Sequence, residues 1–126
     1  VFGTLHTTGS ARTVDRIIDA YPTNQQEQVR AQLSVSIVAV ISQVLLARKD
    51  GKGRVAGFEV MLMTPAIGNL IRKNETNKIA STLQTSRRMG MITLDDYLYD
   101  LVKRDVVERA AALEAAQDPK DLEARL

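Results

Sequence analysis

Two strand-like stretches joined by a short glycine-containing turn constrain the fold of this chain most. The stretches AVISQVLLAR (39–48) and GRVAGFEVMLM (53–63) lie on either side of the turn KDGKG. Both contain many β-branched and other apolar residues, which pack well on a pleated sheet. Gly51 and Gly53 provide the backbone freedom that a tight connection requires. The pattern therefore predicts a β-hairpin.

The glycines of this turn do not form a phosphate-binding loop. The run DGKGR lacks the Gly-x-x-x-x-Gly-Lys-Ser/Thr spacing, and it joins two strands, whereas a phosphate loop joins a strand to a helix. We therefore expect its charged side chains to be the solvated tip of the hairpin.

A strand and two helices are predicted before the hairpin. Val1–His6 has the pattern of the end of a buried strand, which needs neighbouring strands to satisfy its backbone hydrogen bonds. Thr8 or Ser10 is expected to cap the first helix, which ends at Pro22. A capping box at the start of the second helix is predicted from Thr23 and Gln26. The apolar residues with helical spacing are Val14, Ile17, Ile18 and Tyr21 in the first helix, and Val29, Leu33 and Ile37 in the second.

All elements predicted after residue 63 are helices. Thr64 and Pro65 are typical of the N-cap and the first position of a helix. Another helix is predicted from Thr93, where Asp96 follows three residues later, and the helical tail is interrupted at Asp118–Pro119. The residues thus predict an α/β fold, with a strand, helices and a hairpin over 1–63 and an all-helical part over 64–126.

Composition excludes several kinds of chemistry. The chain has no cysteine and one histidine in 126 residues, which excludes disulfides and thiolate metal sites and argues against a histidine metal cage. A net charge of +2 gives little long-range attraction for nucleic acid. The apolar runs are too short for a membrane span. We therefore expect no bound metal, no nucleic acid and no membrane insertion.

The one histidine lies where the predicted strand meets the first helix. His6 is flanked by hydroxyl side chains in the stretch GTLHTTGSAR. One interpretation is a hydrogen-bonded histidine that closes the strand. The other is a phosphate site, because ligands bind at the carboxyl ends of strands in α/β sheets, and an imidazole, hydroxyls and turn amides suit phosphate oxygens. The residues alone leave both interpretations open.

Three stretches in combination resemble the secretion and type IV pilus ATPases. GTLHTTGSARTVDRIID is similar to the His box of that family and the helix that follows it. VISQVLLARKDGKGRVAGFEVMLMTPAIGNLIRK resembles the PilT branch, the pilus retraction motors, and MGMITLDDYLYDLV resembles the C-terminal helical region of that branch. Many extension and secretion ATPases carry a four-cysteine zinc insertion after the strand that matches VISQ, whereas this chain turns straight back.

The resemblance implies the C-terminal part of a RecA-like P-loop ATPase. Residues 1–63 would complete the motor core, including the His box and the hairpin, and residues 64–126 would form a helical C-terminal subdomain. The P-loop, Asp box and Walker B acid of the family lie upstream of its His box, and this sequence contains none of them. The chain by itself is therefore expected to be inactive and to require no cofactor.

The resemblance also implies a function. The full-length protein would be a cytoplasmic motor that uses ATP and Mg²⁺ to retract type IV pili in twitching motility, with His6, Thr7 and Thr8 sensing the γ-phosphate. It would form a homo-oligomer, as a hexamer, and contact the inner-membrane platform protein at the pilus base. The alternatives are a pilus-extension or type II secretion ATPase, or a non-catalytic helical module that docks a partner protein.

The segment AIGNLIRK resembles the retraction motif A-I-R-N-L-I-R-E of the PilT branch. Gly68 replaces an arginine of that motif and Lys73 replaces its glutamate. The glycine costs about 1 kcal/mol of helix stability relative to alanine. We expect Ile67, Leu70 and Ile71 to pack in the core. Asn69, Arg72 and Lys73 are expected to form an exposed contact with the pilus machinery. The residues of the motif are Ala66, Ile67, Gly68, Asn69, Leu70, Ile71, Arg72 and Lys73.

Overall fold

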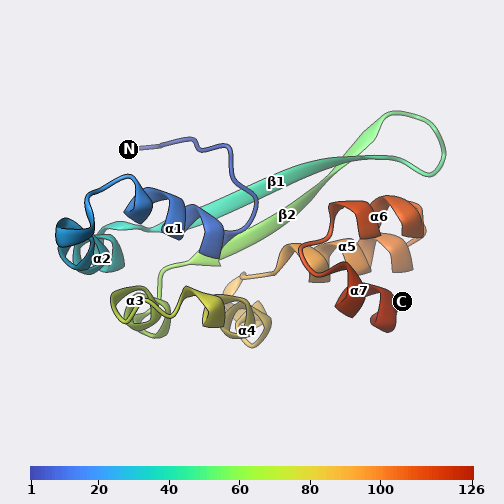
Figure 1. Ribbon diagram of the computed structural model, residues 1–126. Coiled ribbons are helices and arrows are strands. Elements are labelled where there is room, and N and C mark those ends of the chain that lie inside the picture. The colour runs from blue at the N-terminus through green and yellow to red at the C-terminus, as the bar shows by residue number, and fades with distance from the viewer.

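The computed structural model describes all residues, 1–126, and is built around one long β-hairpin with helices along it (Figure 1). Helices α1 to α4 gather around the end of the hairpin that is far from its turn, and α5 to α7 lie along the other half. In chain order the elements are α1 (Ser10–Asp19), α2 (Thr23–Ser36), β1 (Ala39–Ala47), β2 (Arg54–Leu62), α3 (Pro65–Arg72), the 3₁₀ turn η1 (Thr76–Lys78), α4 (Ile79–Gln84), the 3₁₀ turn η2 (Arg87–Met89), α5 (Leu94–Lys103), α6 (Arg109–Ala115) and α7 (Pro119–Arg125).

The predicted hairpin is confirmed. Strands β1 and β2 pair in antiparallel register from Ala39 opposite Leu62 to Ala47 opposite Arg54. The free edge of β2 is bridged at one point, where Val60 exchanges two backbone hydrogen bonds of 2.9 and 3.1 Å with Ile92. The segment before α5 is therefore attached directly to the hairpin.

The turn of the hairpin has the exposed charges and positive-φ glycines that the sequence predicts. Gly51 and Gly53 have φ angles of 73° and 98°. The Asp50 carboxylate accepts hydrogen bonds from the Lys52 N–H at 2.9 Å and from Arg48 at 2.7 Å. The Lys52 amide first, and then Arg48, hold the pKa of Asp50 below its usual value. The stabilisation from Asp50 is therefore present above the usual aspartate range and is lost as the pH falls through the lowered pKa.

The helices after the hairpin begin as predicted. The Thr64 Oγ1 atom accepts a hydrogen bond from the Ile67 N–H at 3.3 Å, and Pro65 is the first residue of α3. The Thr93 Oγ1 atom likewise accepts one from the Asp96 N–H at 3.1 Å at the start of α5. The helical tail is interrupted between α6 and α7, just before Pro119, as the sequence predicts.

Both predicted caps before the hairpin are wrong, although both helices form. Helix α1 starts at Ser10 after Gly9, and no side chain caps it locally. Helix α2 starts at Thr23 itself, because Pro22 occupies the N-cap position with an extended backbone. The Gln26 side chain does not close a capping box but donates a hydrogen bond to the Tyr21 carbonyl at 3.0 Å.

The predicted opening strand is not formed. Residues 1–9 belong to no helix or strand, and the side chains of Val1 and Phe2 are fully exposed. The only sheet consists of β1 and β2, so this segment has no neighbour with which to exchange backbone hydrogen bonds. It leads into α1 as an extended loop (Figure 1).

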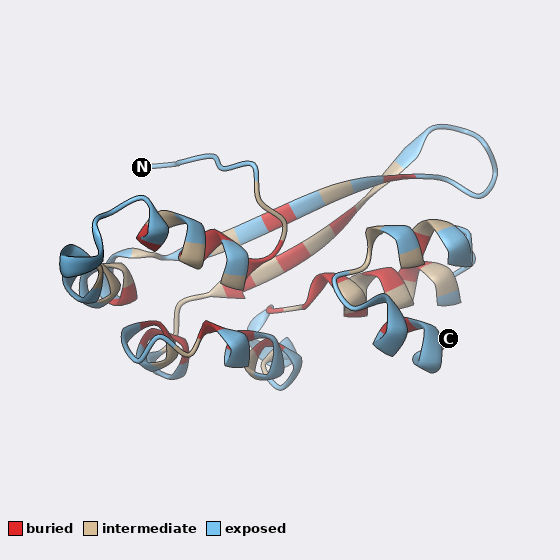
Figure 2. Cartoon of the chain, in the orientation of Figure 1, coloured by how far each residue is buried: buried red, intermediate tan, exposed pale blue.

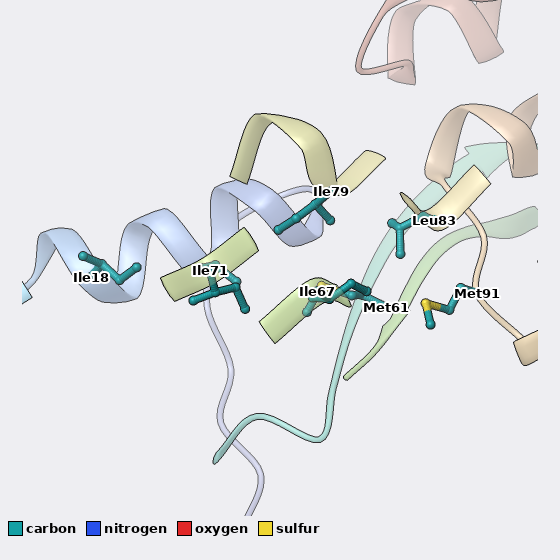
Figure 3. Close-up of a cluster of buried hydrophobic side chains, with 8 residues drawn as sticks. Ile18, Met61, Ile67, Ile71, Ile79, Leu83 and Met91 are labelled. Carbon is teal, nitrogen blue, oxygen red and sulfur yellow. The ribbon is translucent and has the colours of Figure 1, made fainter. Parts of the chain in front are cut away.

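The core consists of two hydrophobic clusters, one at each half of the hairpin (Figure 2). The prediction of a boundary between residues 63 and 64 stays a prediction, since each cluster takes residues from both sides of it. The first cluster (Figure 3) contains Val14, Ile18, Met61, Ile67, Ile71, Ile79, Leu83 and Met91, and the second contains Leu46, Leu94, Leu98, Leu101, Val107, Ala112 and Leu122.

One face of β1 is left outside both clusters. Ile41 is 65% exposed and Leu45 is 51% exposed, whereas Ser42 and Leu46, on the opposite face of the strand, are buried.

None of the helices is both long and apolar enough to cross a membrane.

Candidate functional site

The segment around the one histidine is a short loop whose side chains differ in how they are held. His6 is exposed, and Thr7 and Thr8 are half-buried. The Thr13 hydroxyl donates to the Gly9 carbonyl at 2.8 Å, so the Thr7 hydroxyl is the donor in its 2.8 Å contact with Thr13. The loop is therefore fastened to the first turn of α1, while the exposed His6 imidazole is accessible to a ligand.

The backbone amides of this loop are already used within the chain. The Gly9 N–H donates to the Ser42 hydroxyl at 3.1 Å, and the Ser10 N–H donates to Glu59 at 2.5 Å. The expectation that the turn amides offer hydrogen bonds to a phosphate is thus wrong for these two groups. The His6 imidazole remains available, and the Ser10 hydroxyl is buried without a partner. An imidazole and hydroxyls still suit phosphate oxygens by their chemistry.

Glu59 is a functional candidate that the sequence reasoning missed. This glutamate lies in the middle of β2 and is 3% exposed. Its two carboxylate oxygens accept from the N–H groups of Ser10, at 2.5 Å, and Leu94, at 3.1 Å. A negative charge is thereby placed at the N-termini of α1 and α5, where the helix dipoles favour it. The sequence does contain a signal for Glu59: it is a carboxylate within an otherwise apolar strand, and burying a carboxylate requires hydrogen-bond partners.

The connection between α6 and α7 also reaches the histidine loop. Gly9 has a φ of 97°, and a Cβ atom at this position would lie 2.2 Å from the Gln117 Nε2 atom. The Asp95 carboxylate, in the first turn of α5, holds the N–H groups of Gln117 and Asp118 at 2.8 and 2.9 Å. The positive φ of Gly9 disfavours any other residue at this position, and the Gln117 side chain lies against its backbone, so the loop and the segment between α6 and α7 are in close contact.

The segment 66–73 lies in α3 and ends at its C-cap, Lys73, and its two faces differ as predicted. Ile67 and Ile71 are buried and Leu70 is half-buried, all in or against the first cluster. The residues of the segment on the exposed face are Ala66, Asn69, Arg72 and Lys73. This arrangement confirms the predicted packing of the two isoleucines and Leu70 and the predicted exposure of the three polar residues.

Gly68 has a packing explanation in this structure. It is buried against α2, and a Cβ atom there would lie 3.2 Å from the Ser34 carbonyl oxygen. The Arg72 guanidinium donates to the Ser34 hydroxyl at 3.2 Å. The glycine therefore permits a close approach of α2 and α3, and a larger side chain would require one helix to move.

Similar proteins cover almost the whole chain. A twitching motility protein of Neisseria gonorrhoeae is 49% identical over 122 residues, which is 97% of this chain and 33% of that protein. The type IV pilus retraction ATPase PilT of Pseudomonas aeruginosa is 46% identical over 121 residues, 96% of this chain and 35% of that protein. The chain is homologous to the PilT-type pilus ATPases. It spans about one third of the length of the curated relatives that it matches.

The solved structure of the pilus retraction motor PilT with bound ADP confirms the predicted fold class. The match has a TM-score of 0.87 and 42% sequence identity, and it covers 98% of this chain and 34% of PilT. The chain corresponds to the C-terminal part of PilT, a P-loop ATPase. No protein-family model matches the chain.

Proposed function

We propose that this chain is the C-terminal part of a motor that hydrolyses ATP to retract type IV pili. The observation that carries the proposal is the exposed His6 on a loop fastened by buried hydrogen bonds, in a chain homologous to PilT-type ATPases over nearly its whole length. Residues 1–63 then belong to the motor core and residues 64–126 to a helical subdomain. The protein acts as a hexamer in the cytoplasm, at the inner-membrane base of the pilus.

The proposed role of the histidine loop follows from the His6 imidazole and the Thr8 hydroxyl. ATP would supply the γ-phosphoryl group that is transferred to water, and Mg²⁺ would neutralise the charge on the phosphate oxygens. The His6 imidazole donates a hydrogen bond to an oxygen of this group, Thr8 offers a hydroxyl, and Thr7 braces the loop through Thr13. When the phosphate leaves, the loop loses a charged partner and is free to shift.

ATP titration of two proteins tests the proposal. The full-length protein, with Mg²⁺, is expected to bind and hydrolyse ATP. The chain 1–126 alone is expected to do neither, because it has no P-loop sequence to hold the phosphates. Calorimetry measures binding and phosphate release measures turnover. Hydrolysis by the isolated chain contradicts the proposal, and a full-length protein that neither binds nor hydrolyses ATP supports a non-catalytic docking module.

We further propose that the exposed face of α3 contacts the pilus machinery, with the inner-membrane platform protein as the partner. The substitution Arg72→Glu is expected to abolish retraction while ATP turnover of the full-length protein stays within about twofold, because Arg72 is exposed and is not part of the proposed phosphate site. Its one hydrogen bond, to Ser34, contributes about 1.5–3 kcal/mol to stability. Twitching assays and phosphate release measure the two effects. The matched control is Lys120→Glu, an equal charge change at an exposed position of α7. Normal retraction by the Arg72 variant contradicts the contact.

A further inference from the structure

One buried carboxylate connects two helices that lie far apart in sequence. Ser10 at the start of α1 is 49 residues from Glu59, and Leu94 at the start of α5 is 35 residues from it. Each of the two helices donates its first backbone N–H to a different oxygen of the same side chain. No other hydrogen bond joins the first residue of α1 to the hairpin, because the Ser10 hydroxyl has no partner.

The same position of the hairpin also holds the loop that carries the histidine. Glu59 lies directly opposite Ser42 in the register of β1 and β2. Ser42 accepts the Gly9 N–H and Glu59 accepts the Ser10 N–H, so two consecutive amides are anchored on one cross-strand pair. The pair thus holds the end of the loop that carries His6, three residues before Gly9.

We propose that Glu59 is a positioning residue that fixes the histidine loop and passes its displacement to α5. This inference rests on the proposed function for its connection to ATP. The carboxylate is buried, so water does not replace a hydrogen bond that is lost. A shift of the start of α1 that keeps the hydrogen bond to Ser10 therefore rotates the carboxylate, and this rotation changes the hydrogen bond to Leu94. The contact of Gln117 with Gly9 joins the same loop to the segment after α6.

The test uses Glu59→Gln in the full-length protein. Glutamine keeps the shape of the side chain but has one acceptor oxygen in place of two, so one amide is left facing an NH₂ group. Hydrogen exchange in peptides that contain Ser10 and Leu94 is expected to become at least about tenfold faster at one or both of these amides. We also expect kcat to fall about 10- to 100-fold, because His6 is displaced, with KM changed by less than roughly twofold.

The matched control is Glu27→Gln, which removes the same charge at an exposed position of α2 and is expected to change neither readout. Unchanged exchange at both amides and an unchanged kcat in Glu59→Gln overturn the proposal. If His6→Ala is silent but exchange accelerates in Glu59→Gln, the proposed function fails while the anchoring by Glu59 stands. If Glu59→Gln does not fold, Ser42→Ala tests the same anchor, because it removes only the acceptor of the Gly9 N–H. A normal kcat in that variant overturns the part of the proposal in which the Ser42–Glu59 pair fixes the histidine loop.

Discussion

Replacing His6 with alanine in the full-length protein is expected to lower kcat for ATP hydrolysis about 100-fold while nucleotide affinity changes little. The loss of one preorganised hydrogen-bond donor to developing charge costs about 10²- to 10³-fold in kcat in other enzymes. Affinity is spared because His6 is proposed to meet the terminal phosphate alone, whereas the P-loop of a PilT-type ATPase holds the rest of the nucleotide. Steady-state phosphate release gives kcat, and calorimetry with ADP gives the affinity.

Because His6 is exposed, its replacement can change catalysis without changing the stability of the fold. Since the side chain lies at the surface of this chain, His6→Ala is expected to leave the melting temperature of the chain unchanged. Thr4→Ala is the control, because Thr4 is exposed in the same loop and has no proposed contact with phosphate. Equal turnover in wild type and His6→Ala rejects the phosphate-sensing role, and equal losses in both variants assign the effect to the loop and not to the imidazole.

The largest effect on stability is expected from Leu98→Ala, which should lower the free energy of unfolding of the chain by about 2–5 kcal/mol. Leu98 is completely buried in the second cluster, and its Cδ2 atom lies close to Gly57 of β2, 3.4 Å from where a Cβ atom would be. Alanine leaves a cavity at the contact between α5 and the hairpin, which the surrounding side chains fill only in part. Urea unfolding followed by circular dichroism measures the change.

The matched control for Leu98→Ala is the same substitution at Leu45. Leu45 lies on the outward face of β1 and is 51% exposed, so its truncation removes less buried area and leaves no closed cavity. We expect a loss well below that of Leu98→Ala. Similar losses in the two variants would contradict the assignment of Leu98 to the core of the second cluster.

The elements that sequence reasoning predicted correctly are those whose signals are local. Thr64 and Pro65 lie next to the helix that they start, and Thr93 caps α5 through a residue three positions away. The predicted caps of α1 and α2 were wrong for different reasons. The cap of α1 is supplied by Glu59, 49 residues away, which no local pattern contains. At α2, Pro22 takes the N-cap position one residue before the predicted one.

The candidate site shows the same division between local and distant signals. The position of His6 before a helix and the two faces of α3 could be predicted from nearby residues. The contacts of Glu59 and Gln117 could not, because each joins segments that lie far apart in the sequence. The predicted strand over Val1–His6 did not form, since a strand depends on partners that lie outside its own sequence.

The hairpin determines how this chain can be divided in the laboratory. It contributes Met61 to one hydrophobic cluster and Leu46 to the other, and most of the remaining members come from residues after 63. A polypeptide that stops after β2 would lack all other buried members of the cluster of Leu46 and most of those of the cluster of Met61. One that starts at Thr64 would lack the surface on which α3 and α5 pack. Neither half is expected to fold when it is expressed separately, so a shorter version for crystallisation or binding studies should retain the strands together with helices from both sides.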